Sequence, residues 1–256
     1  METRRVPQSG SELSVVPIPE TSLFRKGLKD GISVCIGYLS VGFAFGIFAV
    51  KGGLTPLEAI LISATNVTSA GQLAAVPVIL SEGSLFELAA SQLIINLRYM
   101  LMSILLSQKF DSTVRQSDRF LIAFVNTDEV FALASSKESV GRAYMFGLIL
   151  MPFLGWTLGT AGGACAGDVL PAMVISALGI AIYGMFIAIV VPAARENRNV
   201  LFCVLIAVAL SCLFRFVPAL SGVQTGFVVI LCSVIAAALT AALFPLEEKE
   251  ENDDEL

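Results

Sequence analysis

The sequence predicts an all-α, polytopic membrane protein whose helices form one transmembrane domain. Hydrophobic residues make up 56% of the 256 residues, charged residues only 14%, and the mean hydropathy is +0.83. A soluble domain carries about 25% charged residues. In addition, apolar runs recur at about the 20-residue length that a membrane helix needs. We therefore expect the chain to lie in a lipid bilayer.

Apolar segments follow one another along nearly the whole chain. The long ones cover residues 31–50, 57–80, 85–107, 142–162, 171–191, 200–217 and 222–244. A shorter one, 120–134, is interrupted by "NTDE". We expect about eight transmembrane segments, with broken or re-entrant helices at 57–80 and 118–136. If one of these two turns back without crossing, seven segments cross instead.

Both ends of the chain are predicted to lie outside the transmembrane domain, which covers residues 24–245. Residues 1–23 are polar and contain three prolines, which is typical of a disordered tail. Residues 246–256 form an acidic, solvated tail that lowers the net charge to −5.

Basic residues indicate the orientation of the first apolar segment. Arg25, Lys26 and Lys29 precede it directly. Lys and Arg in short flanking segments favour the cytoplasmic side of a membrane. The sequence therefore predicts a cytoplasmic N-terminus.

A glycine pattern in the first apolar segment recurs later in the chain. "GFAFGIFAVKGG", from Gly42, is similar to "GWTLGTAGGACA", from Gly155, with Gly46 and Gly159 at the same relative position. Internal repeats are common in transporters, so one interpretation is a repeat around 31–107 and 142–217. The alternative is that these glycines only allow close helix packing, and we favour it for the individual residues.

Polar residues interrupt the second apolar segment within the stretch "TNVTSAGQ". At bilayer depth, one helix cannot satisfy all the donors and acceptors of its Asn and Gln amides. A helix broken here would present backbone N–H groups at the start of its second half, where the helix dipole favours a carboxylate. The alternative is that these residues only pack helices together. The candidate binding residues are Thr65, Asn66, Thr68, Ser69, Gly71 and Gln72.

Charged residues occur in two further apolar segments. Arg98 lies in "INLRYMLMS", two residues after Asn96, which joins the candidate binding residues. A central Arg costs a membrane helix about 2.5–3.5 kcal/mol on insertion scales, so we expect it to pair with an acid. The candidate acids are Asp128 and Glu129 in "NTDEVFA". One would pair with Arg98, and the other would face a cavity, where it binds an ammonium group or carries a proton. The alternative is a loop whose acids are simply hydrated.

The stretch "GGLTPLEA" predicts a helix start rather than a binding site. Thr55 has the chemistry of an N-cap, and Pro56 suits the first turn. Glu58 would then lie at the positive end of the helix dipole.

Together these motifs resemble the AzlC family of branched-chain amino acid permeases. The similar parts are "FGIFAVKGGLTPLEAILISATNVTSAGQLAAV", "INLRYMLMS" and "NTDEVFALA", in this order, within residues 24–245. Tyr99 departs from the histidine that many members have at this position. The resemblance implies a protein of the bacterial cytoplasmic membrane that exports hydrophobic amino acids such as valine, isoleucine, leucine or methionine. It also implies a small membrane subunit of the AzlD type as partner, and a homo-oligomer is compatible with it.

The candidate residues are chemically compatible with an amino acid. The polar stretch would bind the carboxylate, Asp128 or Glu129 the ammonium group, and Phe43 and Phe45 the apolar side chain. The sequence contains neither a GxxxxGK[ST] motif nor any histidine. We therefore expect secondary transport coupled to protons through a carboxylate, with no cofactor and no metal.

The sequence also bears on three other functions. A membrane-embedded enzyme is disfavoured because the chain has no histidine and no GxSxG motif to build a hydrolytic site. A passive channel lined by the polar stretch, and a permease of the same family for another small organic solute, stay open as alternatives. Nothing in the sequence predicts a nucleic-acid partner.

Overall fold

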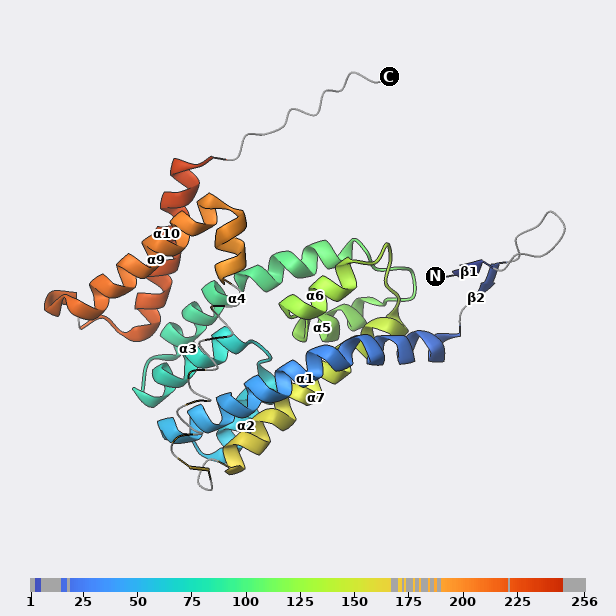
Figure 1. The fold of residues 1–256 in the computed structure, drawn as a ribbon, viewed down its shortest axis with the longest axis horizontal. Coiled ribbons are helices and arrows are strands. Elements are labelled where there is room, and N and C mark those ends of the chain that lie inside the picture. Colours follow the sequence, from blue (N-terminus) through green and yellow to red (C-terminus); the bar gives the residue numbers. More distant parts are fainter. Residues whose placement is uncertain are drawn as a thin grey trace, which may run out of the picture.

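The computed structural model describes residues 3–5, 15–17, 19–166, 190–220 and 222–245, and scattered residues between 170 and 187. Nearly all of the described chain is helical (Figure 1), which confirms the predicted all-α, polytopic class. The helices that are long and apolar enough to cross a membrane are α1 (Glu20–Gly52), α4 (Leu85–Ser107), α7 (Arg142–Ala166), α9 (Arg198–Phe216) and α10 (Thr225–Leu243). A short 3₁₀ helix, η1 (Pro218–Leu220), follows α9.

The described N-terminal residues form a small pair of strands before the first helix. β1 (Thr3–Arg5) pairs antiparallel with β2 (Val15–Pro17). α1 then starts at Glu20, inside the range 1–23 that the sequence predicts to be disordered. The helix can start this early because Glu20 places an acid at the positive end of its dipole. The acidic tail at 246–256 lies outside the described residues.

α1 and α7 lie side by side and run in the same direction (Figure 1). Near the start of both helices, a methyl group added to Gly27 would come within 2.8 Å of the Leu148 nitrogen. Near their ends, a methyl group on Gly46 would come within 2.6 Å of the Ala164 nitrogen. Glycine therefore lets the two backbones touch, which confirms the close-packing interpretation of the glycine pattern. The internal repeat stays a prediction.

The apolar segment 57–80 is a broken helix that folds back on itself. α2 (Pro56–Thr65) and α3 (Ser69–Leu80) are separated by an unwound tip at 66–68. Leu80, the last residue of α3, packs against the end of α1, where a methyl group on Gly52 would lie 3.1 Å from its Cδ1. We call α2–α3 the first hairpin. It enters and leaves on the side of the membrane where α1 ends.

The first hairpin starts with the helix cap that the sequence predicts. The Thr55 hydroxyl accepts a hydrogen bond from the backbone N–H of Glu58 at 3.3 Å, and the Glu58 carboxylate accepts one from the Thr55 N–H at 2.7 Å. The backbone hydrogen bond from Thr55 holds the pKa of the Glu58 carboxyl below its ordinary value. Glu58 therefore has a structural partner at this helix start.

The segment that contains "NTDE" is a second broken helix. α5 (Gln116–Phe124) and α6 (Asp128–Ser135) are separated by a tip at 125–127. The chain that leaves α6 returns to the end of α4, where the Lys109 ammonium donates to the carbonyl oxygen of Lys137 at 2.9 Å. We call α5–α6 the second hairpin. Because α4 runs opposite to α1 and α7, the second hairpin enters from the side opposite to the first.

The hairpins change the expected number of crossings. Their helices contain 8 to 12 residues each, and at 1.5 Å per residue they reach only part of the way across a hydrocarbon core of about 30 Å. The broken segments 57–80 and 118–136 therefore take the re-entrant form that the sequence left open, and neither supplies one of the expected crossings. A further expected crossing, 171–191, falls largely outside the described residues.

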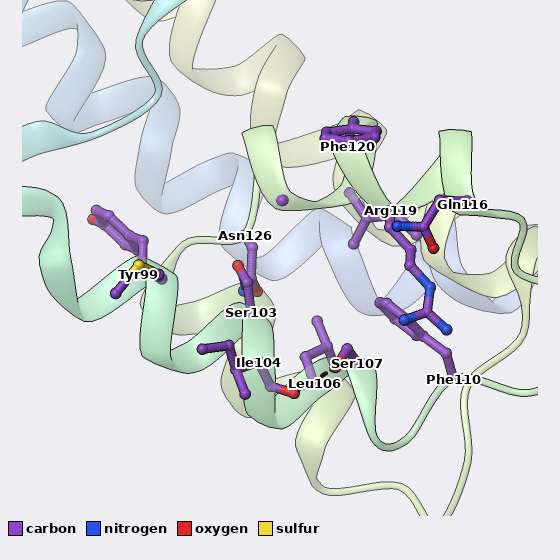
Figure 2. A pocket seen from close by; sticks show the side chains of 13 residues that line it. Tyr99, Ser103, Ile104, Leu106, Ser107, Phe110, Gln116, Arg119, Phe120 and Asn126 are labelled. Atoms are coloured by element: carbon purple, nitrogen blue, oxygen red, sulfur yellow. Dashed lines mark hydrogen bonds between the residues drawn. The ribbon is translucent and has the colours of Figure 1, made fainter.

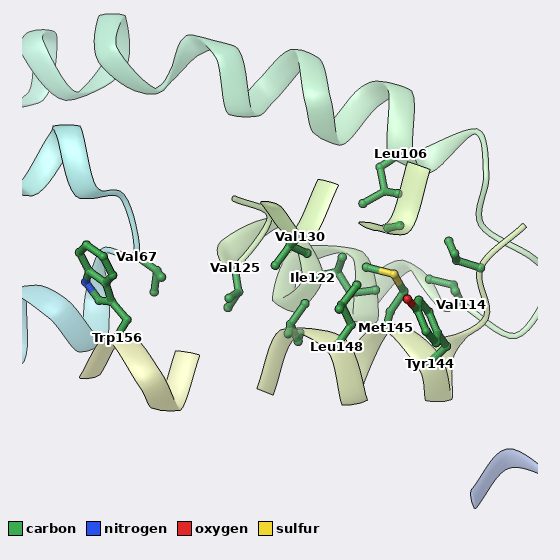
Figure 3. Close-up of a cluster of buried hydrophobic side chains, with 13 residues drawn as sticks. Val67, Leu106, Val114, Ile122, Val125, Val130, Tyr144, Met145, Leu148 and Trp156 are labelled. Carbon is green, nitrogen blue, oxygen red and sulfur yellow. The ribbon is translucent and has the colours of Figure 1, made fainter. Parts of the chain in front are cut away.

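The tips of both hairpins rest on α7 (Figure 3). Val67 from the first tip and Val125 from the second belong to one buried cluster with Leu148 and Trp156 of α7. Trp156 is only 2% exposed, and its ring packs edge-on against Tyr38 of α1 with the ring centroids 5.3 Å apart. Packing on α7 thus fixes the two tips relative to each other.

α9 and α10 lie next to each other (Figure 1), and α10 packs against α4 and α3. The N–H of Gly226, at the start of α10, donates to the carboxylate of the buried Glu87 in α4 at 2.8 Å. None of the residues of α9 is buried. Such exposure is compatible with contact between α9 and lipid.

Candidate functional site

The two hairpin tips meet beside α4 around a cavity of about 200 Å³, which we call the tip cavity. Pockets for drug-sized ligands have volumes of about 300–1,000 Å³, so the tip cavity suits a smaller solute. Four of the predicted binding residues line it. The complete lining is Thr65, Asn66, Val67, Thr68, Asn96, Tyr99, Ala123, Phe124 and Asn126.

Hydrogen bonds hold the first tip in its unwound form. The Thr68 hydroxyl donates to Asn66 Oδ1 at 2.6 Å, and the Asn66 amide donates to Gln92 Oε1 of α4 at 3.5 Å. Thr68 is the N-cap residue of α3, but its side chain makes no capping hydrogen bond to that helix. The positive end of α3, which begins at Ser69, therefore faces the tip without a capping hydroxyl.

Two of the predicted binding residues, Gly71 and Gln72, make contacts between packed helices. Gln72 is fully buried, and its amide donates to the Ser63 hydroxyl at 2.9 Å. That hydroxyl is also hydrogen-bonded to Thr160 of α7 at 2.7 Å. The Gly71 carbonyl accepts from the Gln92 amide of α4 at 2.9 Å. Neither Gly71 nor Gln72 lines the tip cavity, so the alternative of helix packing describes both residues.

The second tip contributes a residue that sequence reasoning missed, Asn126. Its side chain is 2% exposed, and its Nδ2 donates to the Ser103 hydroxyl of α4 at 3.1 Å. Its Oδ1 is buried and has no hydrogen-bond partner among the described residues. Asn126 lies in the break of the second hairpin as Asn66 lies in the break of the first. Each of the two polar breaks contains an asparagine, and this similarity in the sequence could have identified Asn126.

The acidic pair at the start of α6 is divided between two partners. Asp128 forms an ion pair with Arg98 at 2.7 Å. The Arg98 guanidinium also donates to the Tyr99 hydroxyl at 3.0 Å and lies 4.7 Å from the centre of that ring. Glu129 instead accepts a hydrogen bond from the Tyr38 hydroxyl of α1. The sequence predicts the pairing of one acid with Arg98, but the second acid was expected to face a cavity and instead bonds to Tyr38 beside a small gap.

A small gap beside the tip cavity brings the acids close to the start of α3. Ser69, Asp128 and Glu129 are among the residues that line it. Its volume of about 20 Å³ has room for about one water molecule. The site expected from sequence requires the polar stretch and the acids to lie near each other, and they do.

A larger cavity of about 480 Å³ adjoins the tip cavity, and we call it the α4–α5 cavity (Figure 2). Its walls are mostly apolar side chains of these two helices. In Figure 2, Tyr99 lies toward one end of the drawn side chains and Phe110 toward the other, where the Arg119 guanidinium lies 5.5 Å from the Phe110 ring centre. Tyr99, Ala123 and Asn126 line both cavities.

The aromatic residues expected to form an apolar pocket lie elsewhere. Phe45 is buried where α1 meets the first hairpin and the end of α7, in one cluster with Ala59, Val76 and Ala164, and Phe43 packs beside Gly162 of α7. Neither Phe43 nor Phe45 lines the tip cavity or the α4–α5 cavity. Apolar surface at the tip cavity comes from Val67 and Phe124 instead.

The AzlC protein family matches residues 33–170. This range includes both hairpins, α4 and α7, and it contains every residue that lines the two cavities. The chain belongs to the AzlC family. It is thus a membrane protein of a family associated with branched-chain amino acid transport.

Relatives of this AzlC-family chain are also membrane proteins. "Inner membrane protein YgaZ" of Escherichia coli (strain K12) is 30% identical over 238 residues, which cover 89% of this chain and 93% of that protein. An "Uncharacterized membrane protein" of Archaeoglobus fulgidus is 31% identical over 183 residues, which cover 71% of this chain and 80% of that protein. No solved structure matches this AzlC-family chain.

Proposed function

We propose that this AzlC-family protein is a secondary transporter that exports branched-chain or other hydrophobic amino acids across the cytoplasmic membrane of a bacterium. The tip cavity carries this proposal, because two broken hairpins that enter from opposite sides meet there. Transporters use such broken helices because the ends of half-helices offer backbone groups and dipoles to a solute at membrane depth.

The start of α3 is the proposed site for the solute carboxylate. The positive end of this helix favours an anion without the cost of a buried Lys or Arg. Asn66 and Thr68 are already ordered by their mutual hydrogen bond, so a solute need not order them. Thr65 and Asn96 line the same cavity, and Ser69 lies in the adjoining gap at the start of α3. The apolar wall of the cavity receives the hydrophobic side chain of the solute.

We propose that the acids Asp128 and Glu129 couple transport to the movement of protons. Asp128 is balanced by Arg98, and this ion pair positions the start of α6. Glu129 has a neutral hydroxyl, that of Tyr38, as its hydrogen-bond partner. The gap beside both acids is far too small for an amino acid but has room for about one water molecule. Glu129 is therefore our proposed proton carrier.

The remaining parts of the proposal rest on the family resemblance and on the charge pattern of the sequence. A small AzlD-type membrane subunit is the proposed partner, and a homo-oligomer is compatible with the same activity. The basic residues before the first apolar segment favour a cytoplasmic N-terminus. With that orientation, the second hairpin enters from the cytoplasmic side.

Counterflow in proteoliposomes tests the proposal. Purified protein is reconstituted with and without the small subunit, the vesicles are loaded with unlabelled amino acid, and uptake of radiolabelled leucine, valine, isoleucine and methionine is followed. Saturable counterflow of these amino acids is the expected result. Flux that is proportional to the gradient without saturation would indicate a passive channel. Counterflow with a different solute class alone would indicate a permease of other specificity.

A further inference from the structure

We infer that Asn126 recognises the ammonium group of the solute at the junction between the tip cavity and the α4–α5 cavity. The inference rests on the proposed amino acid transport. It adds one residue that binds the solute and one selectivity among solutes. That selectivity is for solutes with a primary amine over carboxylic acids of the same carbon skeleton that lack it.

The first observation is an acceptor that is buried without a partner. Asn126 is 2% exposed, and its Nδ2 is occupied by the Ser103 hydroxyl. Its Oδ1 has no hydrogen-bond partner in the described part of the chain. Buried polar atoms are nearly always hydrogen-bonded, since leaving one unpaired destabilises a fold. An amide oxygen only accepts, so the group that completes it must be a donor.

The second observation is the position of Asn126 between the cavities. It lines both the 480 Å³ and the 200 Å³ cavity, and Figure 2 shows its side chain beside Ser103 on α4. A solute that moves between the cavities therefore passes the Asn126 amide. The neighbours that line both cavities with it are the Tyr99 ring and the small Ala123.

The nearby carboxylates are less suited to this task. Asp128 is paired with Arg98, and Glu129 is bonded to Tyr38. Neither acid lines the tip cavity. A neutral amide oxygen also binds an ammonium group more weakly than an unpaired buried carboxylate would. Weak binding suits a carrier, which has to release its solute on the other side.

The geometry also assigns the two ends of an amino acid to different hairpins. The carboxylate would lie at the start of α3 in the first hairpin, and the ammonium group at Asn126 in the second. A zwitterion would therefore connect the two tips, whereas a carboxylic acid without the amine would contact only one. Recognition and the coupling of both hairpins would then depend on the same group.

Competition against labelled leucine counterflow tests the inference. The competitors are unlabelled leucine and 4-methylpentanoate, which has the skeleton of leucine without its amino group. In the wild type we expect leucine to compete far better. Asn126→Leu should weaken competition by leucine about tenfold to a hundredfold, the effect of losing one hydrogen bond to a charged group. Competition by 4-methylpentanoate should hardly change. The ratio of its half-inhibitory concentration to that of leucine should therefore fall.

A second substitution keeps the test valid if Asn126→Leu does not fold. The aspartate in Asn126→Asp has nearly the same shape and is a stronger acceptor. The ratio of the half-inhibitory concentration of 4-methylpentanoate to that of leucine should therefore rise. Asn199→Leu makes the same chemical change as Asn126→Leu, but on α9, away from both cavities, and should leave the ratio unchanged. Size-exclusion chromatography identifies variants that do not fold.

The outcomes separate this inference from the proposed function. A ratio that stays at the wild-type value in Asn126→Asp and in any folded Asn126→Leu overturns the role of Asn126. Equal weakening of both competitors does the same, because it shows a general loss of packing. If the wild type shows no leucine counterflow, the proposed function itself is wrong.

Discussion

Replacing Gly163 of α7 with alanine tests how closely α1 and α7 touch. The added methyl group would overlap the Phe43 carbonyl oxygen and lie 2.7 Å from its carbonyl carbon. Overpacking costs about 1–3 kcal/mol, and the upper end applies because a backbone cannot rotate away. The higher helix propensity of alanine relative to glycine offsets about 1 kcal/mol of this loss. We therefore expect Gly163→Ala to lower the free energy of unfolding by about 2 kcal/mol.

The chain offers a matched control and a built-in probe for this measurement. Gly37 of α1 has nothing within 4 Å of the position of an added methyl group, so Gly37→Ala should be neutral or stabilise by up to about 1 kcal/mol. Trp156 of α7 is the single tryptophan of the chain, and its ring packs on Tyr38 of α1. Its fluorescence during SDS titration in mixed micelles would follow unfolding. If Gly163→Ala proves as stable as Gly37→Ala, the two backbones do not touch at this point.

Five further substitutions test the site and the first hairpin. Asn66→Leu should abolish counterflow and leave the purified protein monodisperse, because it removes the side chain that orders Thr68; unchanged transport would remove Asn66 from the site. Arg98→Ala should lower the free energy of unfolding by only about 1 kcal/mol, because the two side chains of its ion pair are 40% and 36% exposed. Adding Asp128→Ala to Arg98→Ala should lower the free energy of unfolding little further. If the losses of the two single variants add fully in the double variant, in the same SDS titration, the pairing is contradicted. Glu129→Gln should remove the dependence of efflux on a pH gradient but preserve counterflow, and a retained dependence would exclude Glu129 as the proton carrier. Thr55→Ala should cost about 1 kcal/mol through loss of the cap on α2, and an unchanged SDS midpoint would show that this cap does not limit stability.

Local features of the site could be predicted from the sequence. The break at Asn66 follows from the cost of unsatisfied amides at membrane depth. The pairing of Arg98 with one of two acids follows from the cost of a lone charge there. The cap at Thr55 needs only neighbouring residues. Each of these predictions concerns a group whose requirements are set by its own chemistry and a few adjacent residues.

Features that depend on distant parts of the chain could not be predicted. A polar break indicates where a helix ends, but the direction that follows depends on partners such as Thr160, which holds the first hairpin through Ser63. Phe45 was expected at the solute because it is aromatic, but the fold buries it between α1, the first hairpin and the end of α7 instead. Asn126 stood beside two acids with stronger signals, and only the fold shows that its oxygen is buried without a partner in the described residues.

The bond between Ser63 and Thr160 also bears on how the protein is made. The two residues are 97 positions apart, and at about 5–20 residues per second a ribosome needs about 5–20 s to pass from one to the other. Through that interval the first hairpin exists without the helix that it packs on. Its buried amide at Gln72 and hydroxyl at Ser63 must meanwhile be satisfied by each other, by water or by the insertion machinery. Synthesis of α7 is thus the step that completes the hairpin during biogenesis, and a nascent chain stopped before Thr160 would expose polar groups that quality control can recognise.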